Sequence, residues 1–118
     1  MHVTRVLIVD DHPSCRATAR ALLEAEGFEV VGEAEDGSSA LAAAKTLNPE
    51  LVLLDVQLPD MTGFEVAAAL TFNGSCPDVI LMSSRDAADF GPLVADSGAR
   101  GFIAKAELSG AGLLELLD

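Results

Sequence analysis

The sequence contains no tryptophan and no tyrosine, and its 118 residues include only two cysteines and two histidines. Basic residues are also scarce, because seven lysines and arginines face nineteen aspartates and glutamates and leave a formal net charge of −12. Attraction to nucleic acid and to anionic lipid depends on lysine and arginine, so this charge opposes both. We therefore expect a domain that by itself contacts neither nucleic acid nor membrane.

Long hydrophobic runs are missing as well, since stretches such as LVLL are far too short to cross a bilayer. The opening MHVTRVLIVDD turns acidic at once and lacks the basic and then apolar pattern of a secretory leader. Cys15 and Cys76 form no CxxC motif, which suits free thiols in a reducing compartment. These absences predict a cytoplasmic location and packing or loop roles for both cysteines.

The hydrophobic pattern that is present predicts one α/β domain spanning residues 1–118. Apolar runs of strand length alternate with alanine-rich stretches of helical period, as in a parallel sheet covered on both faces. The predicted strands are Val3–Val9, Phe28–Ala34, Leu51–Leu54, Val79–Met82 and Gly101–Ala104. The predicted helices are Ser14–Glu26, Ser38–Leu47, Gly63–Thr71, Pro92–Ser97 and Leu108–Leu117.

Glycine, asparagine and proline mark the ends of these helices. Gly27 is expected to end the first helix, Asn48 the second and Gly98 the fourth. The Gly91-Pro92 pair interrupts what would otherwise be one long fourth helix, because proline is tolerated at a helix start and costly inside a helix. A short fourth helix is therefore expected, preceded by a mobile loop over residues 83–90.

Polar residues follow the predicted strands. Asp10 and Asp11 end the first strand, Asp55 ends the third, and Lys105 follows the fifth. Ligands of open parallel sheets bind outside the carboxyl ends of the strands, so these side chains are expected to meet there. Gathered carboxylates repel one another unless a cation compensates, and hard oxygen ligands of this kind suit Mg²⁺. Zinc is disfavoured, because the two histidines are far apart in pattern and no cysteine cluster joins them.

The same residues suit phosphoryl transfer. With a metal bound, Asp55 could attack a phosphorus atom and form an acyl phosphate, while Lys105 holds another phosphoryl oxygen. Ser83, at the end of the fourth strand, could donate a hydrogen bond to the new phosphoryl group. Each residue alone has an ordinary explanation, as a helix cap or a solvated surface group. The complete set in this order favours the chemical interpretation.

Four stretches, LIVDDHP, LVLLDVQLPDMTG, ILMSS and GFIAK, occur in this order. Together they resemble the receiver domain of two-component response regulators, and the resemblance covers essentially the whole chain. The DDHP and GARGFIAK stretches are most similar to receivers of the NarL/FixJ-like kind, which usually precede a helix-turn-helix DNA-binding domain. The resemblance implies a flavodoxin-like doubly wound fold, with a five-stranded parallel sheet of order 2-1-3-4-5 and five helices.

The resemblance also implies a metal and phosphoryl site. By it, Asp55 is the phosphoacceptor, and Asp10 and Asp11 form the acidic pair that holds Mg²⁺. The backbone carbonyl of Gln57 is implied as a further metal ligand, and Lys105 as the lysine that binds the phosphoryl group. A sensor histidine kinase is the implied phosphoryl donor, and the implied function is a signalling switch with no enzymatic activity beyond its own phosphoryl transfer and autodephosphorylation.

Ser83 matches the switch hydroxyl of the family, and Ser84 beside it is a further phosphoryl-binding candidate. Phe102 matches the switch aromatic, a position at which many receivers carry tyrosine. Without a hydroxyl, an inward rotation of Phe102 would depend on packing alone. Gln57 and Arg85 flank the expected path of water to the acyl phosphate and are candidates for tuning dephosphorylation. The alternative for Gln57 and Arg85 is that both are ordinary solvated loop residues. The alternative for Phe102 is a ring that stays in one packed position.

Three neighbours of the site have simpler interpretations. His12 could be taken for a metal ligand, but the resemblance places it in the turn entering the first helix. Asp60 and Glu65 are expected to cap the third helix and to complement its dipole.

Other functional classes remain open. A haloacid-dehalogenase-like phosphatase also uses a strand-end aspartate, but it needs a second aspartate where this chain has Gln57. A P-loop hydrolase would need GxxxxGK[ST], which the sequence lacks. A stand-alone receiver and a phosphorylation-independent binding module are the closer alternatives. A homodimer through the surface of the fourth helix, fifth strand and fifth helix is also an expectation for the family.

Overall fold

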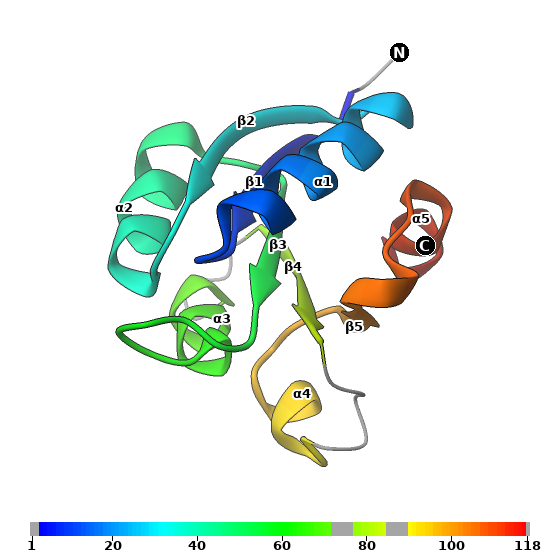
Figure 1. Cartoon of the computed structure of the whole chain (residues 1–118). Coiled ribbons are helices and arrows are strands. Elements are labelled where there is room, and N and C mark those ends of the chain that lie inside the picture. Colours follow the sequence, from blue (N-terminus) through cyan, green and yellow to red (C-terminus); the bar gives the residue numbers. More distant parts are fainter. Residues whose placement is uncertain (1–2, 72–76, 85–89, 118) are drawn as a thin grey trace.

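The computed structural model of the chain describes residues 3–71, 77–84 and 90–117 (Figure 1). Cys76 and Arg85 lie outside the described residues, as does most of the loop expected over residues 83–90. The predicted roles of these residues therefore stay predictions.

A parallel sheet forms the centre of the molecule. Its strands are β1 (Arg5–Val9), β2 (Glu29–Ala34), β3 (Leu51–Asp55), β4 (Asp78–Ser83) and β5 (Gly101–Ala104). They lie in the order β2-β1-β3-β4-β5, and every neighbouring pair is parallel. The predicted fold class and strand order are thus confirmed. The structure extends β3 and β4 by one residue at the carboxyl end, so Asp55 and Ser83 belong to their strands.

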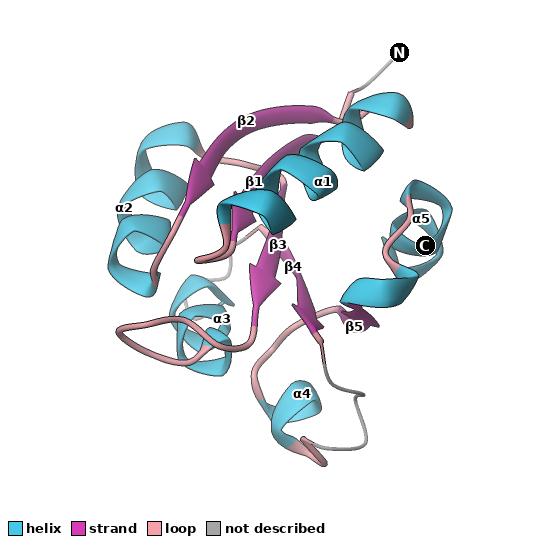
Figure 2. Cartoon of the chain, viewed as in Figure 1, coloured by secondary structure: helices cyan, strands magenta, loops and turns pink. Residues whose placement is uncertain are grey.

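Helices cover both faces of the sheet (Figure 2). The helices are α1 (Pro13–Ala25), α2 (Gly37–Leu47), α3 (Gly63–Thr71), α4 (Leu93–Asp96) and α5 (Gly110–Leu117). One face packs against α1 and α5, whose Leu23 and Leu113 are fully buried. The opposite face packs against α2, α3 and α4 through residues such as Ala40 and Val66. This two-sided cover matches the predicted doubly wound arrangement.

The central strands supply the core because their side chains alternate between the two faces. Leu51 and Leu53 of β3 point to the side of α1 and α5, whereas Val52 and Leu54 point to the other side. All four are completely buried. A strand buried on both faces reads as a continuous apolar run, which is why the sequence revealed β3 so clearly.

Several helix ends agree with the predicted punctuation. Gly27 and Gly98 have φ of 91° and 84°, and Asn48 has φ of 50°, so each takes the left-handed conformation that follows many helices. The expected start of the last helix at Leu108 is wrong. Residues Lys105–Glu107 form a 3-10 turn, and the helix begins at Gly110. Ser109 caps it, since its Oγ accepts a hydrogen bond from the Gly112 N–H at 3.0 Å.

Candidate functional site

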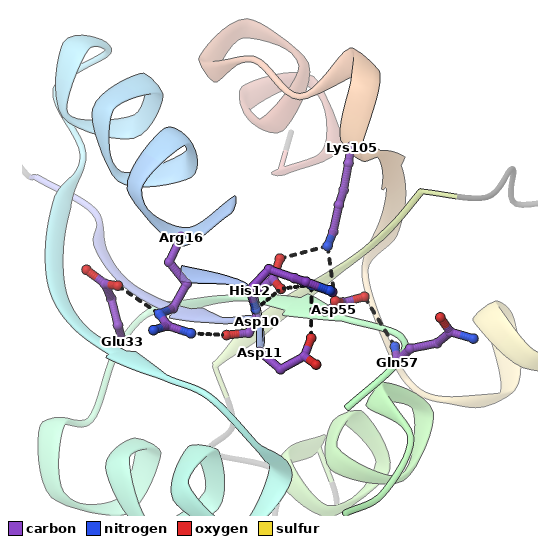
Figure 3. A network of polar contacts seen from close by, with 8 residues as sticks. All are labelled: Asp10, Asp11, His12, Arg16, Glu33, Asp55, Gln57 and Lys105. Carbon is purple, nitrogen blue, oxygen red and sulfur yellow. Dashed lines mark hydrogen bonds and ion pairs between the residues drawn. The ribbon is translucent and has the colours of Figure 1, made fainter. Parts of the chain in front are cut away.

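Three residues from distant parts of the chain meet at the carboxyl edge of the sheet (Figure 3). Lys105 Nζ lies 2.8 Å from Asp10 Oδ2 and 3.1 Å from Asp55 Oδ2. The side chain of Asp10 is fully buried, and that of Asp55 is 5% exposed. The sequence predicted that these residues would meet, and the structure places them in direct contact.

The register of the sheet explains this meeting. Val9 of β1 pairs with Leu54 of β3, so the next residue of each strand is an aspartate at the same level. The Asp10 N–H donates to the Ala34 carbonyl at 3.0 Å, which continues the β1–β2 pairing past the end of β1. Lys105 directly follows β5 and extends across to the two carboxylates.

Asp10 is held in its ionised form. Burial by itself would raise the pKa of this carboxyl, but contact with the Lys105 ammonium and hydrogen bonds from His12 outweigh burial and lower the pKa. The His12 backbone N–H donates to Asp10 Oδ1 at 2.9 Å. Asp10 is therefore a fixed negative charge at the floor of the site.

Asp55 has a different environment. Burial raises the pKa of its carboxyl above the ordinary value, and the charge of Asp10 adds to this effect. The Gln57 backbone N–H, 3.2 Å from Asp55 Oδ1, and the Lys105 ammonium oppose it without reversing it. Burial also disfavours the Lys105 ammonium, but the two carboxylates raise the pKa of Lys105. Two adjacent carboxyls whose pKa values are shifted in opposite directions are typical of a functional site.

The side chain of His12 contacts the acidic pair, although its position in the turn before α1 does not require such contacts. Its Nδ1 is 3.0 Å from Asp10 Oδ1 and 3.0 Å from Asp11 Oδ1, and its side chain is 62% exposed. His12 is also the residue immediately before α1, which Pro13 begins. The sequence correctly placed the backbone of His12 in this turn but did not predict its side-chain contacts.

Arg16 is a site residue that sequence reasoning missed. Its guanidinium donates from an Nη1 to the Asp10 carbonyl, and its Nε lies 3.1 Å from Glu33 Oε1 on β2. Arg20 holds the other oxygen of Glu33, at 2.8 Å. The Arg16 contacts link the backbone of Asp10 to α1 and β2 (Figure 3). The available signal was a basic residue five positions after Asp11, early in the helix that follows the acidic pair.

Two residues of the loop that follows Asp55 cap helices. Thr62 and Glu65 form a capping box at the start of α3, in which the Glu65 N–H donates to Thr62 Oγ1 at 3.2 Å. The expected role of Asp60 at the same helix is wrong. Its carboxylate instead accepts from the N–H groups of Gly37, at 2.8 Å, and Ser38, at 2.9 Å, and so caps α2.

Ser83 is buried at the end of β4, whereas its neighbour Ser84 is exposed. Phe102 on β5 pairs with Leu81 in the sheet and is half-buried on the side of α2, α3 and α4. Its ring centroid lies 5.8 Å from that of Phe90, and Phe90 lies 5.5 Å from Phe64 of α3 in an edge-on arrangement. The predicted switch aromatic is therefore the end of a chain of three rings.

The residues at this edge fit a divalent cation. Asp10, Asp11, His12 and Asp55 can each offer one ligand atom, and these atoms all lie within 4.8 Å of one another. Asp10 Oδ2 is buried, and its partner is the Lys105 ammonium, at 2.8 Å. A buried carboxylate oxygen in this state is a suitable ligand for a hard cation.

Comparison with known proteins identifies the family. The response regulator receiver domain matches residues 6–117. The chain is 41% identical over 103 residues to BvgA of Bordetella pertussis, named as a transcription regulator of virulence factors, and this match covers 87% of the chain and 49% of BvgA. It is 35% identical over 101 residues to the DNA-binding transcriptional activator EvgA of Escherichia coli, covering 86% of the chain and 50% of EvgA.

A solved structure agrees with these sequence matches. The signal receiver domain of NarL from Mycobacterium tuberculosis superposes with a TM-score of 0.86 at 35% identity, covering 99% of this chain and 98% of that domain. The chain spans about half the length of the curated regulators that it matches. Among the described residues, no helix is both long and apolar enough to cross a membrane.

Proposed function

The chain belongs to the family of response regulator receiver domains, and from that premise we propose that it is the phosphoacceptor of a two-component system, with Asp55 as the acceptor. The observation that carries this assignment is the contact of one ammonium, Lys105, with two buried carboxylates, Asp10 and Asp55. Members of this family are phosphorylated by sensor histidine kinases, so a phosphohistidine of such a kinase is the proposed donor.

The proposed metal is Mg²⁺, held by the carboxylates of Asp10, Asp11 and Asp55 and by the backbone carbonyl of Gln57. Bound there, Mg²⁺ would neutralise charge that develops on the phosphoryl oxygens during transfer. The fixed negative charge of Asp10 and the convergence of its carboxylate with those of Asp11 and Asp55 support this assignment. Arg16 would support it indirectly, because its bond to the Asp10 carbonyl fixes the position of the metal-binding carboxylate.

The transfer itself falls to Asp55. An oxygen of its carboxylate attacks the phosphorus atom, the new O–P bond forms, and the P–N bond of the donor imidazole breaks with its electron pair going to nitrogen. Lys105 would exchange its contact with Asp55 for one with a phosphoryl oxygen. The hydroxyl of Ser83 and the exposed Ser84 are the proposed hydrogen-bond donors to the same group.

The proposed switch joins Ser83 to Phe102. Movement of Ser83 toward the phosphoryl group would free space for the Phe102 ring, and the contact of Phe102 with Phe90 would carry the change toward α4. To move such an equilibrium from 1:99 to 99:1, phosphorylation must favour the active form by about 5.5 kcal/mol. The output is proposed to be the surface of α4, β5 and α5, which is also the candidate dimer surface.

The proposed output is control of transcription. The relatives named as transcription regulators are about twice as long as this chain, so we infer that residues 1–118 act as one receiver domain within a regulator that also has a DNA-binding region. A stand-alone receiver and a binding module that does not depend on phosphorylation are the alternatives. A haloacid-dehalogenase-like phosphatase is the weakest of them, because Gln57 occupies the position of its general acid.

Phosphoryl uptake tests the proposal directly. Incubation of the protein with Mg²⁺ and a small acyl-phosphate donor is expected to add the mass of one phosphoryl group, and excess chelator is expected to prevent the addition. Intact-mass measurement reads both results. A protein that gains no mass with Mg²⁺ present would act as a binding module instead, and continuous release of phosphate at a steady rate would point to the phosphatase.

Gln57 is proposed to set the lifetime of the phosphorylated state. Its side chain is exposed and points away from Asp55 in Figure 3, although its backbone N–H contacts the Asp55 carboxylate. Rotation of this side chain toward the carboxylate would let it cover the phosphoryl group. Gln57→Ala is expected to speed loss of the phosphoryl group, because water then reaches the acyl phosphate more easily. The decay of the phosphorylated mass over time measures this, with Glu29→Ala at the far end of the sheet as control. An unchanged decay rate would leave Gln57 as an ordinary loop residue.

A further inference from the structure

A second set of metal-ligand side chains lies at the start of α1. Asp10, His12 and Cys15 can each offer one ligand atom, and these atoms all lie within 4.8 Å of one another. His12 precedes the helix and Cys15 lies in its first turn, so the residues are three apart and fall on one side of that turn. The set differs from the cluster of acids because it contains a thiol and an imidazole.

A cavity lies beside two members of this set, Asp10 and Cys15. It has a volume of about 170 Å³ and is lined by Asp10, Cys15, Thr18 and Lys105, among others. The Asp10 side chain is fully buried, and its Oδ2 forms an ion pair with the Lys105 ammonium at 2.8 Å. Cys15 is a free thiol of intermediate exposure. A buried carboxylate and a free thiol therefore line the same cavity.

We propose that Asp10, His12 and Cys15 bind a borderline cation of the Zn²⁺ class, with water as the fourth ligand. Zinc takes sulfur, imidazole nitrogen and carboxylate oxygen in tetrahedral sites, and three protein ligands with one water are a common arrangement. Thiolate ligands select against Mg²⁺, which prefers oxygen. The sequence disfavours zinc because His2 and His12 are far apart in pattern and no cysteine cluster joins them. The fold supplies the missing ligand by turning Cys15 toward Asp10.

The surrounding charges are compatible with this cation. Lys105 contacts the Asp10 carboxylate at 2.8 Å, and it keeps a second carboxylate partner, Asp55, at 3.1 Å when Asp10 is used by the metal. The Cys15 thiol gives its proton to solvent as Sγ binds. Asp11 is not a member of this set.

Because Asp10 would belong to both sites, Zn²⁺ and Mg²⁺ would exclude each other. The effect of this competition on phosphorylation rests on the proposed function, whereas binding of Zn²⁺ does not. Binding is therefore the property to measure. Failure of phosphorylation with intact zinc binding would contradict only the proposed function.

Cobalt is the probe for the thiolate ligand. The protein with Co²⁺ is expected to show the absorption band of a cobalt–thiolate bond, and added Zn²⁺ is expected to remove this band. Cys15→Ser should abolish the band. It should also weaken Zn²⁺ binding, measured by calorimetry, by at least about 10-fold, because loss of a residue that only supports a metal ligand already lowers metal affinity about 10–100-fold. Cys76→Ser is the matched control and should change neither.

Two further variants separate this site from the acidic pair. Asp11→Asn is expected to weaken Mg²⁺ binding and keep the cobalt band, whereas Cys15→Ser is expected to keep Mg²⁺ binding. His12→Asn should weaken Zn²⁺ binding. The proposal is overturned if Cys15→Ser binds Zn²⁺ as tightly as the unmodified protein, or if Cys76→Ser loses binding to the same extent.

Discussion

Asp55→Asn is expected to abolish phosphoryl uptake completely, so that incubation with Mg²⁺ and an acyl-phosphate donor leaves the mass of the variant unchanged. The amide has nearly the shape of the carboxylate and keeps the contact with the Gln57 N–H possible, but its oxygen is not a nucleophile of comparable strength. Asp78→Asn, at the opposite end of the same sheet, is the matched control and should take up one phosphoryl group. Uptake by Asp55→Asn would place the acceptor elsewhere.

The same substitution is expected to increase stability at neutral pH. The pKa of Asp55 is raised in the folded protein above its ordinary value of 3.8, so the folded state binds this proton more tightly than the unfolded state. The ionised carboxylate then lowers the free energy of unfolding, and this loss develops as the pH rises from about 3.8 through the raised pKa. Below about 3.8 both states hold the proton and the loss disappears.

Urea unfolding across this pH range, with chelator present, measures the effect. Asp55→Asn should exceed the unmodified protein in stability at pH 7, and the difference should narrow as the pH falls. If the stability difference between the two proteins stays constant with pH, the ionisation of Asp55 does not contribute to it. Such an excess of stability in an inactive variant is the usual sign of a site whose chemistry opposes folding.

Gly63→Ala is expected to destabilise the protein and to slow phosphorylation together. A Cβ on this residue would collide with the backbone carbonyl of Asp55 and would lie 2.9 Å from Val56 Cα, and backbone cannot move aside as a side chain can. Alanine in a helix normally gains about 0.5–1 kcal/mol over glycine, but overpacking of this kind costs about 1–3 kcal/mol. The cost of the collision should therefore exceed the gain in helix stability. It should also displace the end of β3, which carries Asp55.

Gly32→Ala provides the comparison. Its Cβ would meet only side-chain methyl groups, 2.6 Å from Leu47 Cδ1 and 3.6 Å from Leu7 Cδ1, which can rotate away. We expect a smaller loss of stability and normal phosphoryl uptake for Gly32→Ala. Thermal unfolding and intact mass after acyl-phosphate treatment report both properties. Normal uptake by a well-folded Gly63→Ala protein would show that the close approach of α3 to β3 does not position Asp55.

Much of the fold follows from local pattern. Short, fully apolar runs such as LVLL are typical of strands buried on both faces, and their alternation with amphipathic helices predicts a parallel sheet. The same logic places strand-end residues at one edge, which is why Asp10, Asp55 and Lys105 could be brought together before any coordinates. The start of α5 was the clear error, because the capping serine, Ser109, was read as part of the helix.

Side-chain partners were much harder to foresee. Asp60 lies just before α3 in sequence and was assigned to that helix, yet its carboxylate caps α2, whose first residue is 23 positions earlier in the chain. Arg16 reaches the Asp10 carbonyl across the start of α1. A pattern of residue types fixes the face or edge on which a side chain lies, but not the rotamer it adopts or the element it reaches.

The sequence by itself determined the fold class and the strand-end position of the acids and the lysine, because strand and helix periods are local properties of the chain. Only the tertiary structure decided that the pKa values of the two buried carboxyls shift in opposite directions. Burial and the contacts of Lys105 lower the pKa of Asp10 and leave that of Asp55 raised. It also decided that ligand atoms of His12 and Cys15 lie within 4.8 Å of one from Asp10, since that requires three side chains to converge in space.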